Sequence, residues 1–593
     1  MRISAELERV LSQASADSLS SVLSTLHRVE NRDWKLSEAA SIHFLRNLTL
    51  EGIEPFLKYH LYRAALQPRI SFGGFNTPRQ DLLNPEWESR RTQTDLLVLA
   101  LTLEEFAPSS RLPGWDAHQT GRELRELFEL AHHHSGSLLA INTFICPLYS
   151  FGNLAPNGSD LSQRIRQLND SVREFAASRP GEIVLVDWDR LARILGERQT
   201  FDRRYAYLAR APFRPPFLNL YAQELARAVA ALKGHAKKAL VLDCDNTLWG
   251  GVVGEDGLEG IQLHPAEHPG SAYYDFQAAL LQLAARGVLL ALCSRNNEAE
   301  IWEVLAQHPH CLLKREHFAS FRIGWEDKAE YLVSLARELR LGLDSLVFVD
   351  DNPAECHRIR RALPEVAVVS VPTERSELPH LLAKEGWFES LAVSAEDAAR
   401  STMIGQDLVR RPAPEESLQE YLLSLQQVAK VHRVRSEEVP RVAQLTQKTN
   451  QFNLTTRRYS AAQITAWADD PNTAVFTLSA SDRHGDLGLT GVLIARREGT
   501  IARIDSLLMS CRVLGRDLEI AFVEYCLKEL STSWNPGLFR AEYIPTAKNG
   551  QVAGFWEKEG FLRTTKRDET AFFELVPAGR RWKSPTFIRV VED

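Results

Sequence analysis

Residues 241–249 read Val241-Leu242-Asp243-Cys244-Asp245-Asn246-Thr247-Leu248-Trp249, which places two carboxylates one residue apart. The apolar run 239–242 before them predicts a buried strand that ends where the carboxylates begin. In an open α/β sheet, side chains at the carboxyl ends of strands line the ligand crevice. We therefore expect Asp243 and Asp245 at such a crevice, although an Asp-x-Asp pair alone is also typical of a turn or a helix cap.

Three later elements carry polar groups at matching places. A second apolar strand, 288–293, ends in Ser294, and a third, 346–349, ends in the acids Asp350 and Asp351. Between them Lys328 stands before an apolar helical stretch. A carboxylate nucleophile, a proton donor, a hydroxyl, an ammonium and extra carboxylates for a hard cation are the parts that phosphoryl transfer requires.

The order of these elements resembles the four motifs of the haloacid dehalogenase (HAD) superfamily of phosphotransferases. This resemblance implies that Asp243 is the nucleophile and that Asp245 is the acid/base. It further implies a set of phosphate-binding residues, Thr247, Ser294, Arg295, Asn296 and Lys328, and a set of Mg²⁺ ligands, Asp243, Asp245, Asp350 and Asp351. Mg²⁺ is the expected cofactor.

Composition bounds the class of protein. At 593 residues the chain is too long for one hydrophobic core, so several domains are expected. The 77 acidic residues outnumber the 70 basic ones without a basic block, which argues against nucleic acid as a partner. The amino terminus lacks a signal peptide and no apolar run is long enough for a membrane span, so we expect a cytoplasmic protein. Seven scattered cysteines favour reduced thiols over a disulfide framework.

We predict an α/β multidomain protein with four parts. They are an α/β domain over 1–234, a HAD-like Rossmann domain over 235–385, a helical linker over 386–428 and a carboxy-terminal domain over 429–593. The first part faintly resembles the flavodoxin-like fold of SGNH hydrolases, but no Gly-Asp-Ser nucleophile block is found near 45–47. We therefore expect a scaffold or docking domain there and not a hydrolase.

The carboxy-terminal part carries two further motifs. Residues 507–517 run from a strand through a glycine-containing turn into an amphipathic helix, whose amino terminus suits a phosphate. Residues 547–561 form the second motif, and together the two resemble the GNAT acyltransferase fold. The resemblance implies a phosphopantetheine site at Arg512, Gly515, Arg516 and Asn549. Asp517 departs from the family's turn and puts acetyl-CoA binding in doubt.

The combination of these motifs with residues 248–257 and 449–454 resembles the FkbH-like family of polyketide biosynthesis over nearly the whole chain. Membership would imply that the substrate is 1,3-bisphosphoglycerate and the partner an acyl carrier protein. The enzyme would remove phosphate, hold a glyceryl thioester on a cysteine and pass the glyceryl group to the carrier's phosphopantetheine thiol.

The acyl-carrying cysteine is ranked from its sequence position. Cys511 comes first, because it stands beside Arg512 and a helix amino terminus, where a thiolate is stabilised. Cys244 is second and Cys293 third, because strand alternation turns both toward the core. That all three are inert packed thiols stays open.

The spacing of the motifs bears on access to the HAD site. Only about 48 positions separate Asp245 from Ser294, so no large cap domain fits over the HAD site. Two rival functions stay open: a plain Mg²⁺-dependent phosphatase, and an acetyl-CoA-dependent N-acetyltransferase with a degenerate HAD module.

Overall fold

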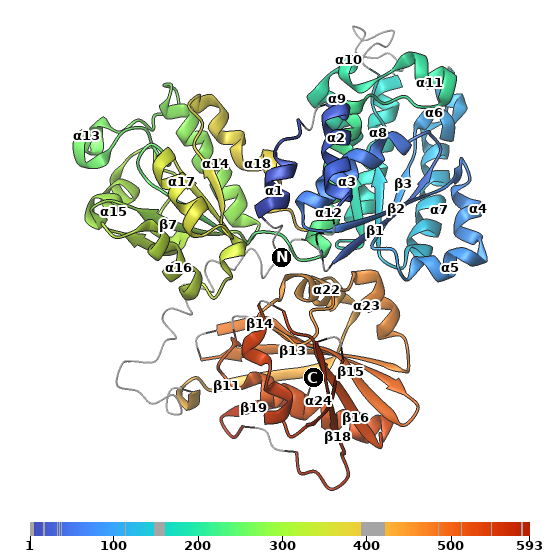
Figure 1. Cartoon of the computed structure of the whole chain (residues 1–593), viewed down its shortest axis with the longest axis vertical. Helices are drawn as coiled ribbons and strands as arrows, with labels where there is room; N and C mark the ends of the chain where they lie inside the picture. Colours follow the sequence, from blue (N-terminus) through green and yellow to red (C-terminus); the bar gives the residue numbers. More distant parts are fainter. Residues whose placement is uncertain are drawn as a thin grey trace. The chain divides into compact units, whose positions relative to one another are not determined.

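The computed structural model describes residues 5–592 except 16–17, 33, 35, 37, 113, 148–160, 393–421, 484, 511–512, 547, 568 and 583–584. Two five-stranded sheets and one nine-stranded sheet follow one another along the chain (Figure 1). The chain forms two compact units, one of residues 1–235 with 458–466 and the other of residues 236–457 with 467–593. The long segment of the first unit ends at residue 235, one residue after the boundary predicted at 234. Among the described helices none is both long and apolar enough to cross a bilayer.

The first sheet has the strand order β2-β1-β3-β4-β5 and is parallel throughout. Its strands are β1 (Ala39–Arg46), β2 (Gln67–Phe75), β3 (Leu96–Ala100), β4 (Leu138–Asn142) and β5 (Ile183–Val186). The described helices of this unit before residue 236 are α1 (Ala5–Leu11), α2 (Leu19–Glu30), α3 (Glu54–Arg63), α4 (Pro78–Leu83), α5 (Pro85–Arg91), α6 (Leu103–Phe106), α7 (Ala117–Ser135), α8 (Leu161–Ala177), α9 (Trp188–Leu195), α10 (Glu197–Thr200), α11 (Arg203–Ala209) and α12 (Pro215–Leu232). This is the flavodoxin-like order, as predicted.

The second sheet is also parallel, with the order β10-β9-β6-β7-β8. Its strands are β6 (Ala239–Leu242), β7 (Leu289–Ser294), β8 (Phe318–Ile323), β9 (Leu346–Asp350) and β10 (Ala367–Ser370). Its helices are α13 (Val253–Gly260), α14 (Gly270–Ala285), α15 (Glu298–Gln307), α16 (Lys328–Glu338), α17 (Pro353–Ala362) and α18 (Leu381–Glu385). The first strand in sequence lies in the middle of the sheet, as in the predicted Rossmann-like fold.

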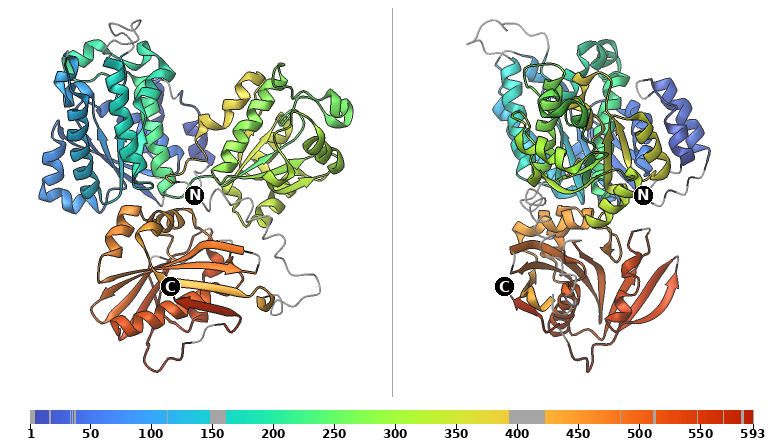
Figure 2. Two further views of the ribbon diagram at one scale, coloured as in Figure 1. Left: turned by 180° about the vertical axis from the view of Figure 1, so that it is seen from behind. Right: turned by 90° about the vertical axis from the view of Figure 1, so that its left-hand side faces the viewer.

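Both faces of the second sheet are covered, which explains why its strands are continuously apolar. Helices lie on both faces of the sheet (Figure 2). Leu240 and Leu242 pack with α14 and α15 on one face, while Ala239 and Val241 pack with α16 and α17 on the other. Between Asp245 and β7 the chain adds only α13 and α14 to its regular structure. The prediction that no large cap domain is inserted there is confirmed.

The third sheet is mixed, with the order β17-β18-β16-β15-β14-β13-β11-β19. Its strands are β11 (Gln427–Arg433), β12 (Phe452–Asn453), β13 (Thr473–Asp482), β14 (Gly485–Glu498), β15 (Ile501–Met509), β16 (Leu538–Tyr543), β17 (Leu562–Arg567), β18 (Thr570–Leu575) and β19 (Ile588–Glu592). The described helices beyond residue 425 are α22 (Val439–Lys448), α23 (Ala461–Ala468), α24 (Leu518–Trp534) and α25 (Phe555–Lys558).

Two details of the third sheet bear on the predictions. Strand β15 pairs with β16 only over Ile501–Ile504, whereas the end of β15 pairs with the short strand β12. Gln427 and Val428 lie in β11, so the end of the predicted helical linker 386–428 is strand. A strand there gains ladder hydrogen bonds to both β13 and β19, which outweigh local helical preference. Most of that linker lies outside the described residues.

Candidate active site

Three carboxylates converge at the carboxyl edge of the second sheet. Asp243 follows β6, and Asp350 and Asp351 lie at the end of the neighbouring strand β9. One oxygen from each lies within 4.8 Å of the others. The backbone N–H of Asp243 donates to the Val349 carbonyl over 3.0 Å and so extends the pairing of the two strands to the site.

Lys328 brings the opposite charge to this cluster. It is the first residue of α16, which is capped by the Asp327 side chain. Its ammonium lies 2.9 Å from a carboxylate oxygen of Asp243 and 2.6 Å from one of Asp350. Burial disfavours the charged ammonium, but the two carboxylates outweigh burial and raise the pKa of Lys328. Lys328 therefore stays protonated and bridges two acids.

One ammonium does not neutralise three carboxylates. Burial and the Asp243 charge raise the pKa of Asp350, against the lowering effect of Lys328. Burial, followed by Asp243 and Asp350, raises the pKa of Asp351 to about 6. Both shifts have the sign expected for like charges crowded in a poorly solvated place.

Asp245 lies in the site but outside this cluster. Its carboxylate accepts hydrogen bonds from the Asn296 side chain over 2.8 Å, the Trp249 indole over 3.0 Å and the Val253 backbone over 3.2 Å. The group of acids close enough to share a cation contains Asp243, Asp350 and Asp351 only, among the residues that the structure describes. The indole, amide and backbone donors thus already contact the Asp245 carboxylate, and its role as a fourth metal ligand stays a prediction.

The predicted phosphate-binding side chains also surround this edge. Ser294 ends β7 and is buried, and its hydroxyl lies 3.4 Å from the Asn296 amide nitrogen. Thr247 is fully buried, and its hydroxyl makes no hydrogen bond within the described part of the chain. Arg295 is turned to Glu355, 2.8 Å away. Buried hydroxyls normally have partners, so the unsatisfied Thr247 oxygen is suited to a ligand.

The donor set fits Mg²⁺. The three clustered groups offer oxygen ligands only, which a hard cation prefers. Oδ1 of Asp243 lies near Lys328, yet it makes no well-aligned hydrogen bond with any described residue. A cation at this oxygen would supply the missing interaction.

Arg375 is a residue of this site that sequence analysis missed. Its charge lowers the pKa of Asp351, although burial and the neighbouring acids outweigh it, and its guanidinium lies 6.0 Å from the ring centre of Tyr273. It stands in a short 3-10 helix after β10, where no motif marks it. Only the fold brings it to the acids.

Two of the three predicted acyl-carrying cysteines are buried. Cys244 packs among Leu248 and Trp249 in the core, as strand alternation predicts, and Cys293 packs on the opposite face. Burial raises the pKa of both thiols well above the ordinary value. Neither is therefore disposed to act as a thiolate. Cys511 and Arg512 lie outside the described residues.

The remaining predicted phosphopantetheine residues hold their own domain together. Gly515 adopts a positive φ of 77° in the turn before α24. Arg516 is buried and lies 3.1 Å from Asp482. The buried Asn549 amide donates to the carbonyls of Asn453 and Ile544 over 3.0 and 2.9 Å. A role of these residues in ligand binding stays a prediction.

Comparison with known proteins supports the fold of the first part of the molecule. No protein-family model matches the chain, and no curated protein is significantly similar to it. Among solved structures, the N-terminal part of the protein BF1531 from Bacteroides fragilis, described as containing a phosphatase domain complexed with Mg, matches with a TM-score of 0.57 and 23% identity. That match covers 62% of this chain and 98% of the other.

Weaker likenesses involve acetyltransferases. The ribosomal-protein-S18-alanine N-acetyltransferase of Escherichia coli matches with a TM-score of 0.21 and 14% identity over 25% of this chain and 93% of the other. A GNAT-family acetyltransferase from Streptococcus pneumoniae matches with a TM-score of 0.21 and 9% identity over 25% and 98%. Such TM-scores do not establish a common fold. The comparisons therefore show that 62% of this chain shares the fold of the N-terminal part of the Bacteroides fragilis protein, and they show no family.

Proposed function

We propose that this protein is a Mg²⁺-dependent phosphotransferase of the HAD type, with Asp243 as its nucleophile. The observation that carries the proposal is the convergence of Asp243, Asp350 and Asp351 around the buried Lys328 at one sheet edge. Fold similarity to a protein with a Mg-bound phosphatase domain supports it. Because similar folds host different reactions, the fold alone does not establish this activity, and the evidence for it comes from the site residues.

The side chains divide the chemistry between them. Asp243 attacks the phosphorus of a phosphate ester and forms an acyl phosphate, which water then hydrolyses. Asp245, oriented by Trp249 and Asn296, delivers a proton to the leaving oxygen and later takes one from the attacking water. Lys328 and the Ser294 hydroxyl hold the phosphoryl oxygens. Asp243, Asp350 and Asp351 would hold Mg²⁺, which would compensate the negative charges of these acids and of the substrate phosphate.

The finer proposal follows the FkbH-like resemblance. The substrate is then 1,3-bisphosphoglycerate, whose carbon 3 phosphate is removed at Asp243. A cysteine thiolate attacks the carbonyl at carbon 1, the C–O bond to phosphate breaks, and inorganic phosphate leaves. The resulting glyceryl thioester passes to the phosphopantetheine thiol of an acyl carrier protein, which regenerates the enzyme thiol. An uncapped site suits a bulky partner of this kind.

Cys511 is our first candidate for the acyl-carrying thiol. Its two rivals, Cys244 and Cys293, are fully buried and have raised pKa values. The same burial favours a second candidate function, a plain phosphatase without acyl transfer. The two functions differ in one product, since only the first yields a covalent glyceryl-enzyme.

Intact-mass spectrometry separates the two functions. The protein is incubated with 1,3-bisphosphoglycerate and Mg²⁺, with and without a phosphopantetheinylated carrier protein. A glyceryl adduct on the enzyme, lost when glyceryl-carrier appears and absent in Cys511→Ser, supports acyl transfer through Cys511. Free glycerate or its phosphates as the sole products, with no adduct on either protein, would leave a plain phosphatase.

A further inference from the structure

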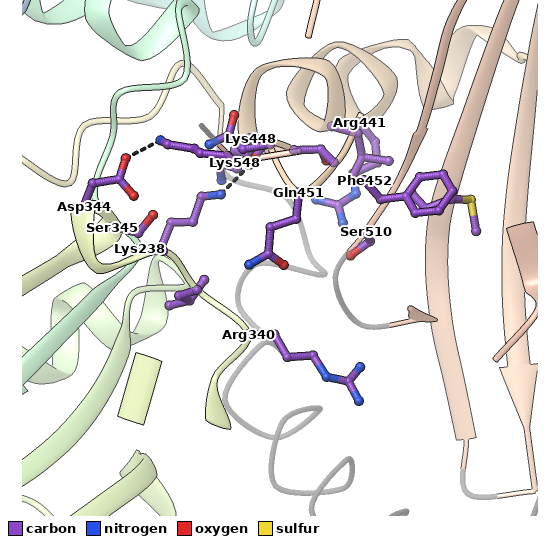
Figure 3. A pocket seen from close by; sticks show the side chains of 16 residues that line it. Lys238, Arg340, Asp344, Ser345, Arg441, Lys448, Gln451, Phe452, Ser510 and Lys548 are labelled. Carbon is purple, nitrogen blue, oxygen red and sulfur yellow. Dashed lines mark hydrogen bonds and ion pairs between the residues drawn. The ribbon is translucent and has the colours of Figure 1, made fainter. Parts of the chain in front are cut away.

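A polar cavity lies within the second unit, apart from the acidic cluster. It has a volume of about 270 Å³, and its lining includes five basic side chains and one acid (Figure 3). They are Lys238, Arg340, Arg441, Lys448, Lys548 and Asp344. A cavity with this excess of cations is suited to an anion.

The cavity is separate from the candidate active site. Lys238 stands directly before β6 and Arg340 before β9, whereas Asp243 follows β6 and Asp350 ends β9. The two sites therefore lie at opposite edges of the same sheet. Since a strand rises about 3.3 Å per residue, the four residues of β6 alone account for roughly 13 Å between them. An anion bound in the cavity is out of reach of Asp243.

Two of the lysine ammonium groups in the lining are held by oxygen atoms. Lys548 forms an ion pair with Asp344, and the Lys238 ammonium donates to the backbone carbonyl of Lys448. Burial lowers the pKa of Lys237, the residue before Lys238, to about 8; the Asp344 charge opposes this shift and the Lys548 charge adds to it. The Asp344 carboxylate interacts electrostatically with both Lys548 and Lys237. An anionic ligand would relieve the repulsion between these two lysines.

Neutral hydrogen-bonding groups also line the cavity. They belong to Thr449, Asn450, Gln451 and Ser510. Figure 3 shows Gln451 and Ser510 among the basic side chains. Hydroxyl and amide groups of this kind bind hydroxyl or amide groups of a ligand. In the chain Ser510 directly precedes Cys511, the first candidate for acyl transfer. The cavity thus offers cationic groups to an anion and neutral polar groups to an uncharged polar chain.

Arg340 occupies a position where glycine is the usual residue. It follows the end of α16 with a φ of 53°, in the left-handed region, and the Leu341 N–H closes the turn on the Ala336 carbonyl over 2.9 Å. Helices commonly end with glycine in this conformation, because a side chain there is strained. Arg340→Gly would therefore remove the guanidinium from the cavity lining without straining this turn.

We propose that this cavity binds the phosphate group of an organic phosphate ester, at a second site distinct from the Asp243 site. Two ligands share this chemistry: the phosphopantetheine arm of a carrier protein and a phosphorylated three-carbon acid. Naming the arm as the ligand rests on the proposed function, whereas the anion site itself does not.

Isothermal titration calorimetry of the full chain tests the site. The titrations are made in EDTA, where the acidic cluster without Mg²⁺ repels phosphates. We expect 4′-phosphopantetheine or 3-phosphoglycerate to bind with one site per chain, at least tenfold more tightly than unphosphorylated pantetheine. The tighter of the two identifies the source of the phosphate. Binding of neither, or equal binding of pantetheine, would overturn the proposal.

Matched variants locate the binding. Arg340→Gln and Lys548→Met should each weaken the titration at least tenfold, whereas Arg337→Gln, which removes an exposed arginine of the same helix outside the cavity, should not. Arg340→Gly should weaken binding equally while the melting temperature stays or rises. Wild-type affinity in both cavity variants would place the ligand elsewhere.

The proposed phosphotransferase function is tested separately on the same proteins. Mg²⁺-dependent hydrolysis of p-nitrophenyl phosphate should be unchanged in the cavity variants. If wild-type hydrolysis is absent while the cavity binds phosphate esters, the phosphotransferase proposal fails and the second site stands. If hydrolysis is present but no cavity variant alters binding, the second site fails alone.

Discussion

The two parallel sheets use the same edge in opposite ways. At the carboxyl edge of the first sheet, the Asn142 side chain accepts from the Leu101 N–H and donates to the Leu101 carbonyl, both over 2.9 Å. Asn47 makes the same double contact with Thr102, over 2.8 and 3.0 Å. These amides satisfy backbone groups and join neighbouring strand ends. The polar atoms of these two side chains thus stabilise the fold.

The second sheet places charges at that edge. Asp243, Asp350 and Asp351 crowd around one ammonium, and the Thr247 hydroxyl and an Asp243 oxygen lack aligned hydrogen bonds among the described residues. Such an arrangement costs stability unless a ligand completes it. The two edges therefore differ in charge: neutral amides join the strand ends of the first sheet, whereas three carboxylates gather around one ammonium in the second.

The largest effect is expected for Asp243→Asn. The amide is nearly isosteric but cannot attack phosphorus, so phosphate release should fall on the order of a thousandfold or more. The matched control is Asp187→Asn at the corresponding edge of the first sheet, where the aspartate caps α9 and asparagine can cap as well. Release within twofold of wild type is expected there. Near-normal phosphate release by the folded Asp243→Asn variant would show that Asp243 is not the nucleophile.

Lys328→Met should destabilise the second sheet by about 3–5 kcal/mol, because it leaves the buried Asp243 and Asp350 carboxylates without their counter-ion. Added Mg²⁺ should recover part of the loss by binding those acids. Hydrogen exchange of β6 and β9 with and without Mg²⁺ measures both effects. A loss that Mg²⁺ does not reduce would argue against a metal at the acids.

Asn142→Ala should cost about 1–3 kcal/mol, because it leaves the buried N–H and carbonyl of Leu101 unsatisfied. Hydrogen exchange of β3 and β4 measures the loss of protection. Phosphate release by the second sheet should not change. A fall in release without loss of fold would show that the first sheet's edge takes part in the chemistry after all.

The smallest effect concerns a buried histidine of the first unit. Burial lowers the pKa of His60 to about 4 from 6.5, although its hydrogen bond to Asn219 opposes the shift. The unfolded chain therefore takes up a proton first as the pH falls. Keeping His60 neutral therefore costs the folded protein nothing well above pH 6.5. As the pH falls from 6.5 toward 4, the free energy of unfolding decreases, by about 1 kcal/mol at pH 5.5.

A His60→Gln variant, which cannot take up this proton, provides the comparison. Protection of α3 against hydrogen exchange should fall less in the variant than in the wild type between pH 7 and pH 5.5. Equal falls would mean that His60 is not held neutral in the folded protein.

Much of this edge could be predicted because its residues follow apolar strands directly. Asp243, Ser294 and Asp350 each end or follow a buried run, and the carboxyl ends of parallel strands meet by topology. The order of strands in both parallel sheets agreed with the expected folds. Local sequence suffices where strand direction alone decides the position of a side chain.

The rest depended on contacts that sequence does not reveal. The chain turns sharply after Asp245, with Asn246 at a φ of 52°, so strand alternation no longer predicts where the Asp245 carboxylate points. Arg375 reaches the acids from a segment without a motif. The cavity around Lys238 and Lys548 joins residues about 300 positions apart, each of which looks like an ordinary surface lysine in sequence.

Peptide mapping after rapid acid quench shows whether Asp243 is the nucleophile. The wild-type protein is mixed with 1,3-bisphosphoglycerate, or with a general phosphate monoester, in Mg²⁺ and in excess EDTA. We predict one phosphoryl group on the peptide that contains Asp243, localised to that residue, in Mg²⁺ and none in EDTA. Turnover with no phosphoryl group on Asp243, or a phosphoryl group on another residue, would contradict the account.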